Sequence, residues 1–354
     1  MKIWSNRAGR DDRGERISTG YLTRQRALLL LALLVGLLGL TALAALAIGS
    51  EEIAAPRLVE ALTSVLIGRP SGLSLEQETI LFRIRLPRVA LAIGVGAALA
   101  LSGAAFQALL RNPLADPYVL GISGGAALGS ILAGLFVPGL VAGQMAGGFL
   151  GAGLAMAAVY QLGRREDDPA HLVLAGVIMS TLLSSLIVLL TALANSLQLR
   201  RITLWLLGDL STGTAGGAIF VLVVAVLAGL VLTSKARALN LLMIGERDAF
   251  ALGIETAEVR WQVYLMASVL TAAAVTAGGA IGYVGLVVPH LIRLAAGADN
   301  RLVIPASALG GALLVLIADM VARTAIAPRE LPTGAIIALL GAPVFLFLLI
   351  RGRR

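Results

Sequence analysis

Side chains capable of chemistry are sparse in this 354-residue chain, and the most prominent of them are arginines. Three arginines stand within residues 83–88, directly before 22 uncharged residues at 89–110. The planar guanidinium pairs bidentately with carboxylates, so such a cluster suits either recognition of an acidic partner or anchoring of a helix end among lipid headgroups. Arg323 follows Asp319 by four residues, a spacing that also lets these two pair along one helix.

The sequence lacks the residues that most catalytic and metal sites use. It has no cysteine, which excludes disulfides, thiol catalysis and thiolate metal sites, and it contains neither a GxxxxGK[ST] phosphate loop nor an HExxH motif. His290 has no carboxylate or cysteine beside it, which is more typical of a structural hydrogen bonder than of a ligand. We therefore predict no enzyme activity, no metal site and no cofactor bound by this chain.

The composition is that of a polytopic membrane protein. Apolar residues make up 58% of the chain, charged ones only 14%, and the mean hydropathy is +0.92. A formal charge of +8 in a soluble protein would suggest nucleic acid. In a membrane protein, Lys and Arg instead sit in loops and orient the helices. Membrane lipid is thus an expected partner, and nucleic acid is not.

Uncharged runs predict an all-α fold with about ten membrane-spanning helices. The first run, 27–49, exceeds the 7–15 residues of a signal-peptide core, so we expect a retained span, with a cleaved signal as the alternative. Two spans are expected within 117–163, joined by a turn at Val137-Pro138-Gly139. The other spans are expected at 89–110, 171–194, 216–232, two within 261–292, 302–321 and 333–350.

Charge distribution orients these spans with both termini in the cytoplasm. In that orientation the inner segments carry 19 of the 28 Lys and Arg residues. The domain division is then a cytoplasmic tail at 1–26, one transmembrane domain at 27–350 and a cytoplasmic tail at 351–354. Glycines from 278 to 285 interrupt one apolar run, which predicts a partly non-helical return inside the protein or beside a cavity.

The predicted spans hold a single carboxylate, Asp319. Proton-coupled transporters generally need a titratable group within the membrane, so its near absence weakens an ion-coupled mechanism. A sodium site built from backbone carbonyls would not need such a group and stays open. The absence of a phosphate loop means that any work derived from ATP must come from a partner chain.

Four stretches together resemble the FecCD-type permeases, the membrane subunits of binding-protein-dependent ABC importers for iron-siderophores, heme and vitamin B12. They are LSGAAFQALLRNPLADPYVLGISGGAALG (101–129), LNLLMIGERDAFALGI (239–254), GGAIGYVGLVVPHLIRL (278–294) and ADMVARTAIAPRELPTGAIIALLGAPVFLFLL (318–349). The resemblance covers nearly everything after the first span. It implies a homodimeric permease in the bacterial inner membrane, driven by two copies of a separate ATPase that carry ATP and Mg, and served by a periplasmic or lipid-anchored binding protein.

The resemblance also implies roles for particular residues. Docking of the binding protein falls to Arg85, Arg88 and Arg323. The amphipathic segment 239–254 corresponds to the coupling helix that receives motion from the ATPase, through Leu242, Ile244, Gly245, Glu246 and Ala249. From the pattern alone, this segment is an ordinary interfacial helix.

The gate and the pathway are predicted from the same resemblance. Asn112 and Leu114 match part of the cytoplasmic gate, although Asn-Pro is also simply a good turn. Related permeases have a small hydroxyl pair where this chain has Pro169-Ala170, which leaves the gate geometry open. The pathway is expected along the hydroxyl residues Ser123, Ser180, Thr181 and Ser184, which also suit close helix packing.

The sequence leaves two other functions open. An ion-coupled secondary transporter would move solute without an ATPase, and an intramembrane enzyme would turn over a lipid or peptide. The sequence offers no paired carboxylates or nucleophile-base pair for the enzyme. It distinguishes neither among siderophore, heme and cobalamin nor between a homodimer and a heterodimer with a paralogous permease.

Overall fold

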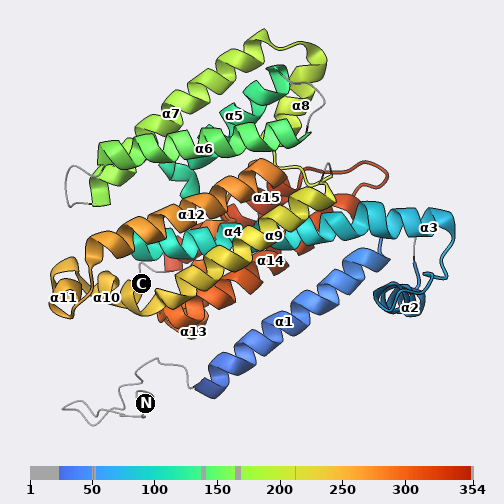
Figure 1. The fold of residues 1–354 in the computed structure, drawn as a ribbon, viewed down its shortest axis with the longest axis horizontal. Helices are drawn as coiled ribbons and strands as arrows, with labels where there is room; N and C mark the ends of the chain where they lie inside the picture. Colours follow the sequence, from blue (N-terminus) through green and yellow to red (C-terminus); the bar gives the residue numbers. More distant parts are fainter. Residues whose placement is uncertain are drawn as a thin grey trace.

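The computed structural model describes residues 24–49, 51, 53–136, 141–163, 169–211 and 213–351. Within these ranges the chain is helical and contains no strand, which confirms the predicted all-α class (Figure 1). Most of the predicted tail at 1–26, the turn Val137-Pro138-Gly139 and the end of the C-terminal tail lie outside the described residues.

Helices matching the ten predicted spans are present in the described residues. Seven are long and apolar enough to cross a membrane, and three shorter ones are apolar. The long ones are α1 (Arg24–Ala47), α4 (Leu86–Leu109), α6 (Val141–Gly163), α7 (Pro169–Leu193), α9 (Ala215–Ser234), α12 (Thr256–Gly278) and α14 (Asn300–Thr324). The shorter ones are α5 (Ile122–Phe136), α13 (Val284–Ala296) and α15 (Thr333–Arg351).

Short helices mark the two ends of this bundle. At one end, called the α8 end, lie α2 (Ala55–Leu66), α3 (Leu75–Thr79), α8 (Ser196–Leu206) and the loop 325–332 (Figure 1). At the opposite end, the α11 end, lie α10 (Ala236–Ile244) and α11 (Glu246–Ala251). A π-helix, η1 (Ile80–Arg85), joins α3 to α4, and a short 3-10 helix, η2 (Pro117–Leu120), precedes α5.

Helix α4 is the centre of the bundle. Nearly every residue of α4 from Pro87 to Leu109 is buried, although the helix is apolar enough to face lipid. It packs against α9, α12, α13 and α14. Glycines permit this approach, because a Cβ at Gly96 would stand 2.2 Å from the carbonyl oxygen of Gly311 in α14, and one at Gly103 would stand 1.9 Å from that of Gly285.

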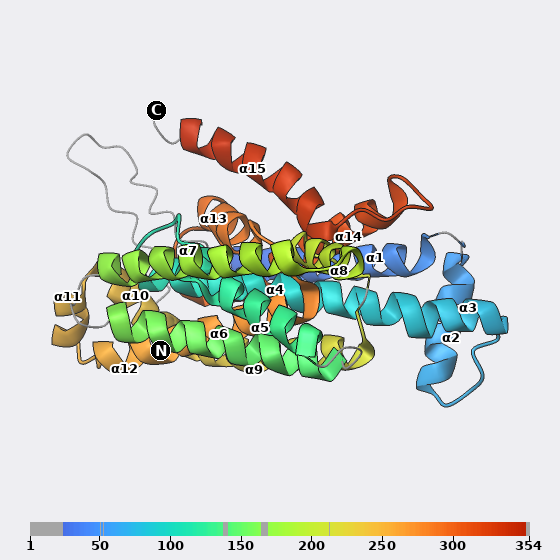
Figure 2. The ribbon, with the colours of Figure 1, turned by 90° about the horizontal axis from the view of Figure 1, so that it is seen from above.

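Helices α5, α6 and α7 form a second layer beside this core (Figure 1). The α5–α6 pair also meets through glycine, since a Cβ at Gly129 would lie 2.1 Å from the carbonyl oxygen of Gly147. In Figure 2, α15 diverges from the rest of the bundle, and an apolar groove of about 300 Å³ separates it from α13 and α14. The bundle is therefore open along α15, and exposed apolar side chains also cover the outer faces of α1, α7 and α9.

The predicted non-helical return lies between α12 and α13. Helix α12 ends at Gly278, and Tyr283 takes a positive φ of 66° just before α13 begins. The return is fixed to α8 by a backbone hydrogen bond, because the amide of Ala280 donates to the carbonyl of Trp205 at 3.1 Å. The irregular backbone is thus held inside protein, as its place in a membrane requires.

Replacing Gly96 with Ala should destabilise the bundle, because the new methyl group meets backbone rather than a movable side chain. We expect a loss of about 1–3 kcal/mol, typical of overpacking, read as an earlier thermal unfolding transition in detergent. Gly153→Ala in α6 is the matched control, since a Cβ there meets nothing within 4 Å and alanine favours helix. Equal transitions for the two variants would contradict the close α4–α14 packing.

Candidate functional site

Arg85 and Arg323 close the C-terminal end of α1. The last four carbonyls of a helix have no partner within the helix, and here each is satisfied. The carbonyl of Ala45 accepts from Arg323 Nη2 at 2.9 Å, and that of Leu46 accepts from Arg85 Nη1 at 2.8 Å. The carbonyl of Ala47 accepts from Arg85 at 3.1 Å, and that of Ala44 from the amide of Ile48. Two cations at this helix end also complement its dipole.

Arg88 belongs to a second, ionic cluster that joins three helices. Its Nε donates to Asp319 Oδ1 of α14 at 2.9 Å, and its Nη1 donates to Glu330 Oε2 at 2.8 Å. Thr333, the first residue of α15, donates to Asp319 at 3.2 Å. The carboxylate of Asp319 is completely buried, so these partners supply what water would otherwise provide.

The arginines predicted to dock a binding protein are thus buried and already bonded within the chain. Arg85 is 3% exposed and Arg88 is 6% exposed. Arg323 forms the suspected pair with Asp319, with Nε and Oδ2 3.4 Å apart, and both side chains are buried. Docking by these residues stays a prediction, and Glu330, which pairs with Arg88, has a side chain that is 44% exposed.

The α11 end holds the predicted coupling segment. Leu242 and Ala249 are buried and fix α10 and α11 to the bundle, whereas Ile244 is 69% exposed and Phe250 is 70% exposed. Gly245 has an extended backbone between the two helices, and a Cβ there would lie 3.1 Å from Asp248 Oδ2. The segment therefore presents apolar side chains outward from an anchored base.

Glu246 connects this segment to two other elements. Its Oε1 accepts from Arg260 of α12 at 2.9 Å and lies 3.3 Å from Arg111 Nη2. Arg111 directly precedes Asn112 in the predicted gate turn and has a positive φ of 50°. A single carboxylate thus joins the coupling segment, α12 and the gate turn, a connection that the sequence alone did not reveal.

A second anchor of α10 is built from amides. Asn240 donates to Asp299 Oδ1 at 2.7 Å and accepts from Asn300 Nδ2 at 2.9 Å, which holds α10 to the start of α14. Arg293 of α13 joins the same network through Asn300 at 3.4 Å and Gln107 at 3.1 Å. Sequence reasoning missed this network because its members come from four separate stretches.

The gate turn is exposed and locally braced. Asn112 accepts from the amide of Leu114 at 2.9 Å, and both side chains are exposed. Asp116 accepts from the amide of Tyr118 at 2.9 Å and begins η2, and burial raises the pKa of its carboxyl to about 6. Helix α7 begins at Pro169, and the side chains of Pro169 and Ala170 lie outside what the structure describes.

The predicted pathway residues do not form one lining. Thr181 and Ser184 lie on the exposed face of α7. Ser180 turns inward, where its hydroxyl donates to the carbonyl of Tyr118 at 3.4 Å, and Ser123 is buried within α5. Within one copy of the chain, Thr181 and Ser184 therefore face outward, whereas Ser180 and Ser123 do not.

A model of the FecCD transport family matches residues 32–351. The chain belongs to the FecCD transport family. It is 43% identical over 283 residues to the hemin transport system permease protein HmuU of Yersinia pestis, covering 77% of this chain and 84% of that protein. It is 41% identical over 281 residues to the vitamin B12 import system permease protein BtuC of Vibrio cholerae, covering 78% and 84%.

One further relative and one solved structure are also similar to this chain. The molybdate import system permease protein MolB of Haemophilus influenzae is 35% identical over 306 residues, covering 85% of this chain and 89% of that protein. A solved chain of a metal-chelate type ABC transporter in an inward-facing conformation shares 34% identity with a TM-score of 0.81, covering 91% and 98%. This FecCD member is therefore a multi-pass permease subunit of an ABC importer, which decides against the ion-coupled transporter and the intramembrane enzyme.

Replacing Asp319 with Ala should destabilise the permease strongly, because Arg88 and Arg323 would then be buried cations without their shared carboxylate. Breaking a buried pair on one side costs about 3–5 kcal/mol, which thermal unfolding in detergent would detect. Glu60→Ala on the exposed face of α2 is the control, expected within about 0.5 kcal/mol of the parent. A loss of stability no larger than that of the control would show that the ionic contacts of Asp319 do not stabilise the fold.

Proposed function

We propose that this permease imports a bulky metal chelate, such as heme, cobalamin or an iron-siderophore, across the bacterial inner membrane. The names of its relatives support this class, because they include hemin and vitamin B12 permeases. The observation that carries the mechanism is the link from Glu246 to Arg111, since it joins the predicted coupling segment to the predicted gate turn. The chain itself binds no nucleotide in this proposal, and ATP and Mg belong to two copies of a partner ATPase.

The partner ATPase would bind the α11 end from the cytoplasm, where both termini also lie. The exposed Ile244 and Phe250 offer apolar anchors for a groove on that partner. When the ATPase pair closes on ATP, α10 and α11 would move with it. Glu246 would then pull on Arg111, and the turn holding Asn112 and Leu114 would follow.

A second copy of the chain would complete the pathway. The exposed leucines of α7 and the divergent α15 offer apolar surface against which a second copy would pack (Figure 2). Thr181 and Ser184 on the open face of α7 would then face the shared channel. Their hydroxyls offer weak hydrogen bonds to a chelate without binding it tightly, which suits a transport pathway.

The binding protein would dock at the α8 end. Glu330 supports a specific form of this docking, because its exposed carboxylate already pairs with Arg88. A carboxylate of the binding protein would take its place on Arg88, so Glu330 acts as an internal competitor. Arg85 and Arg323 would support the surface by holding the end of α1 rather than by contacting the partner.

Co-expression with the chromosomal neighbours, followed by purification of the tagged chain in mild detergent, tests the proposed function. We expect a stoichiometric ATPase and a bound ligand with a heme, corrin or ferric-chelate absorption spectrum. Solute uptake by the purified chain alone, driven by an ion gradient, would contradict the proposal.

Reversing the charges of the Glu246–Arg111 pair tests the coupling. Glu246→Arg should lower transport per ATP hydrolysed, because the substituted side chain repels both Arg111 and Arg260. Adding Arg111→Glu should restore part of the loss, as expected for a direct pair. Glu255→Gln, at a helix end without a side-chain cap, is the control. Independent, additive losses would show that the pair does not transmit motion.

Replacing Glu330 with Gln tests the docking. Removing the competing carboxylate should strengthen binding-protein association by up to about fivefold, because partly exposed pairs contribute about 0.2–1 kcal/mol. Association rates on immobilised permease–ATPase complex would measure this, with Glu76→Gln as an exposed control. Weaker association in Glu330→Gln would mean that Glu330 is itself part of the docking surface.

A further inference from the structure

A chain of four hydrogen-bonded polar side chains crosses the α11 end from α10 to the central helix α4. The four residues, called the polar relay, come from α10, α14, α13 and α4 and are Asn240, Asn300, Arg293 and Gln107. Asn240 Oδ1 accepts from the backbone amide and from the side-chain amide of Asn300, at 2.9 Å each. Arg293 donates to Asn300 Oδ1 at 3.4 Å and to Gln107 Oε1 at 3.1 Å. The relay therefore joins the predicted coupling segment to α4.

Gln107 ends the relay at the predicted gate turn. Its side chain is buried, and its Nε2 donates to the carbonyls of Gly285 and Leu286 at 3.2 Å each. Its backbone carbonyl accepts from the amide of Asn112 at 3.1 Å. The residue that receives Arg293 thus also holds the gate turn. This connection is separate from the ionic link through Glu246.

Arg293 is a partly buried cation whose partners are all neutral. Besides Gln107 and Asn300, it donates to the carbonyl of Ala104 at 3.3 Å. Among the residues that the structure describes, no carboxylate pairs with it, whereas Arg88 has two such partners. A cation of this kind gains little stability, because loss of water offsets its hydrogen bonds. Its planar fork gives it another property, since it bonds α4 and α14 at the same time.

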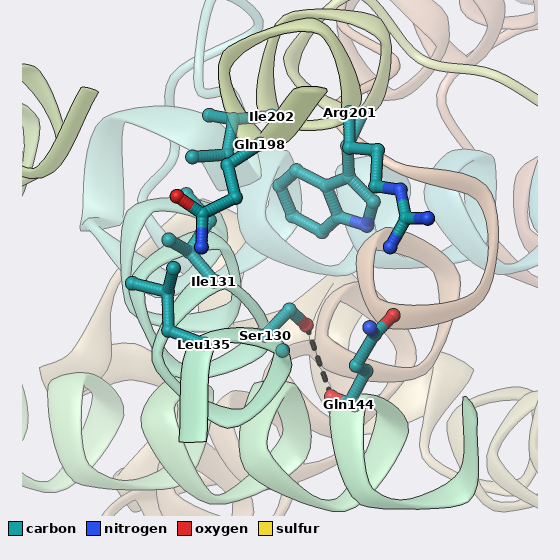
Figure 3. Close-up of a pocket in the computed structure, with 9 residues that line it drawn as sticks. Ser130, Ile131, Leu135, Gln144, Gln198, Arg201 and Ile202 are labelled. Atoms are coloured by element: carbon teal, nitrogen blue, oxygen red, sulfur yellow. Dashed lines mark hydrogen bonds between the residues drawn. The ribbon is translucent and has the colours of Figure 1, made fainter. Parts of the chain in front are cut away.

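An arginine at the opposite end of the bundle shows the usual alternative. Arg201 of α8 is exposed, and in Figure 3 its guanidinium points toward the amide of Gln144 beside a cavity of about 90 Å³. Within the described part of the chain it has no hydrogen bond or ion pair. Water hydrates such a cation, so the fold supplies no acceptors. Around Arg293, by contrast, two neighbouring helices supply three acceptors.

We propose that Arg293 is a positioning residue for transport, which makes the gate turn follow the coupling segment. When α10 moves, Asn240 would carry the start of α14 with it. Arg293 would pass this displacement to Gln107, and the carbonyl of Gln107 would pass it to Asn112. Bonds to neutral oxygens lengthen and re-form during such a movement at a lower cost than a buried ion pair. This role rests on the proposed function, in which the ATPase moves α10 and α11, and it adds a second route to the one through Glu246.

A single cysteine on the gate turn tests this role, because the chain has none of its own. Leu114→Cys places a thiol where the native side chain is 45% exposed. In the permease–ATPase complex, its rate of reaction with a soluble maleimide should change severalfold between the nucleotide-free state and the state trapped with ATP and vanadate. Adding Arg293→Met, which removes the fork at similar volume, should reduce this change about twofold or more. ATPase association and the thermal unfolding transition should be retained.

Two further variants separate positioning from charge and from packing. Arg293→Lys keeps the charge but cannot bridge two helices, so it should also reduce the response. Arg301→Met is the matched control, because Arg301 is an exposed arginine at the start of α14 outside the relay. A parent-like response in Arg293→Met, or an equal loss in Arg301→Met, would overturn the role. An earlier unfolding transition or lost ATPase association in both Arg293 variants would make Arg293 a structural anchor and would also overturn it.

Double variants distinguish the relay from the ionic link. Combining Arg293→Met with Asn240→Ala should reduce the response no further than the stronger single change, because both interrupt one route. Combining Arg293→Met with Glu246→Arg should add the two losses. A response that depends on Glu246 but not on Arg293 would overturn this role and leave the proposed function standing. If Leu114→Cys shows no nucleotide-dependent change in the parent, the proposed coupling fails and this role fails with it.

Discussion

The carboxylate of Asp319 is the point on which one end of this membrane protein depends. A charge away from water is costly unless it is paired and hydrogen-bonded, and here Arg88, Arg323 and Thr333 all converge on it. Those partners belong to α4, α14 and α15, so satisfying one carboxylate fixes three helices. The same arginines then reach further, because Arg323 holds a carbonyl of α1 and Arg88 holds Glu330 in the loop before α15.

Close packing of helix backbones holds the core together away from the Asp319 cluster. Without a hydrophobic driving force between helices in lipid, association depends on close contact of backbones. Helix α4 achieves this contact through Gly96 and Gly103, against Gly311 and Gly285 on two different helices. A central helix is thus buried on all sides, and the exposed apolar side chains lie on the helices around it.

The α11 end is joined to the bundle by ion pairs as well as by packing. Glu246 is only partly buried, and its pairs with Arg111 and Arg260 join segments that are far apart in sequence. Partly solvated pairs of this kind contribute little to stability, which suits the proposed role of Glu246 in coupling the α11 end to the predicted gate turn. The amide network holds α10 to the start of α14 through the buried side chain of Asn300 and the partly buried side chains of Asn240 and Asp299. The segment thus has one firm anchor and one ionic link to the gate turn.

The sequence by itself determined the class, the family and the ten helices, because hydrocarbon thickness sets span length and because the ordered string around RNPLADP is long and specific. It also identified the non-helical return, since glycines between 278 and 285 interrupt an apolar run. It did not determine what the charged residues do. The docking role expected for Arg85 stays a prediction. The sequence did not show that Arg85 closes the end of α1, because the carbonyls of Leu46 and Ala47, 39 and 38 residues earlier in the chain, become its neighbours only through packing. Likewise Arg88 and Asp319 stand 231 residues apart, and Glu246 and Arg111 are joined only by the fold. Pairing of charges depends on distance in space, and only the tertiary structure decides which charges meet.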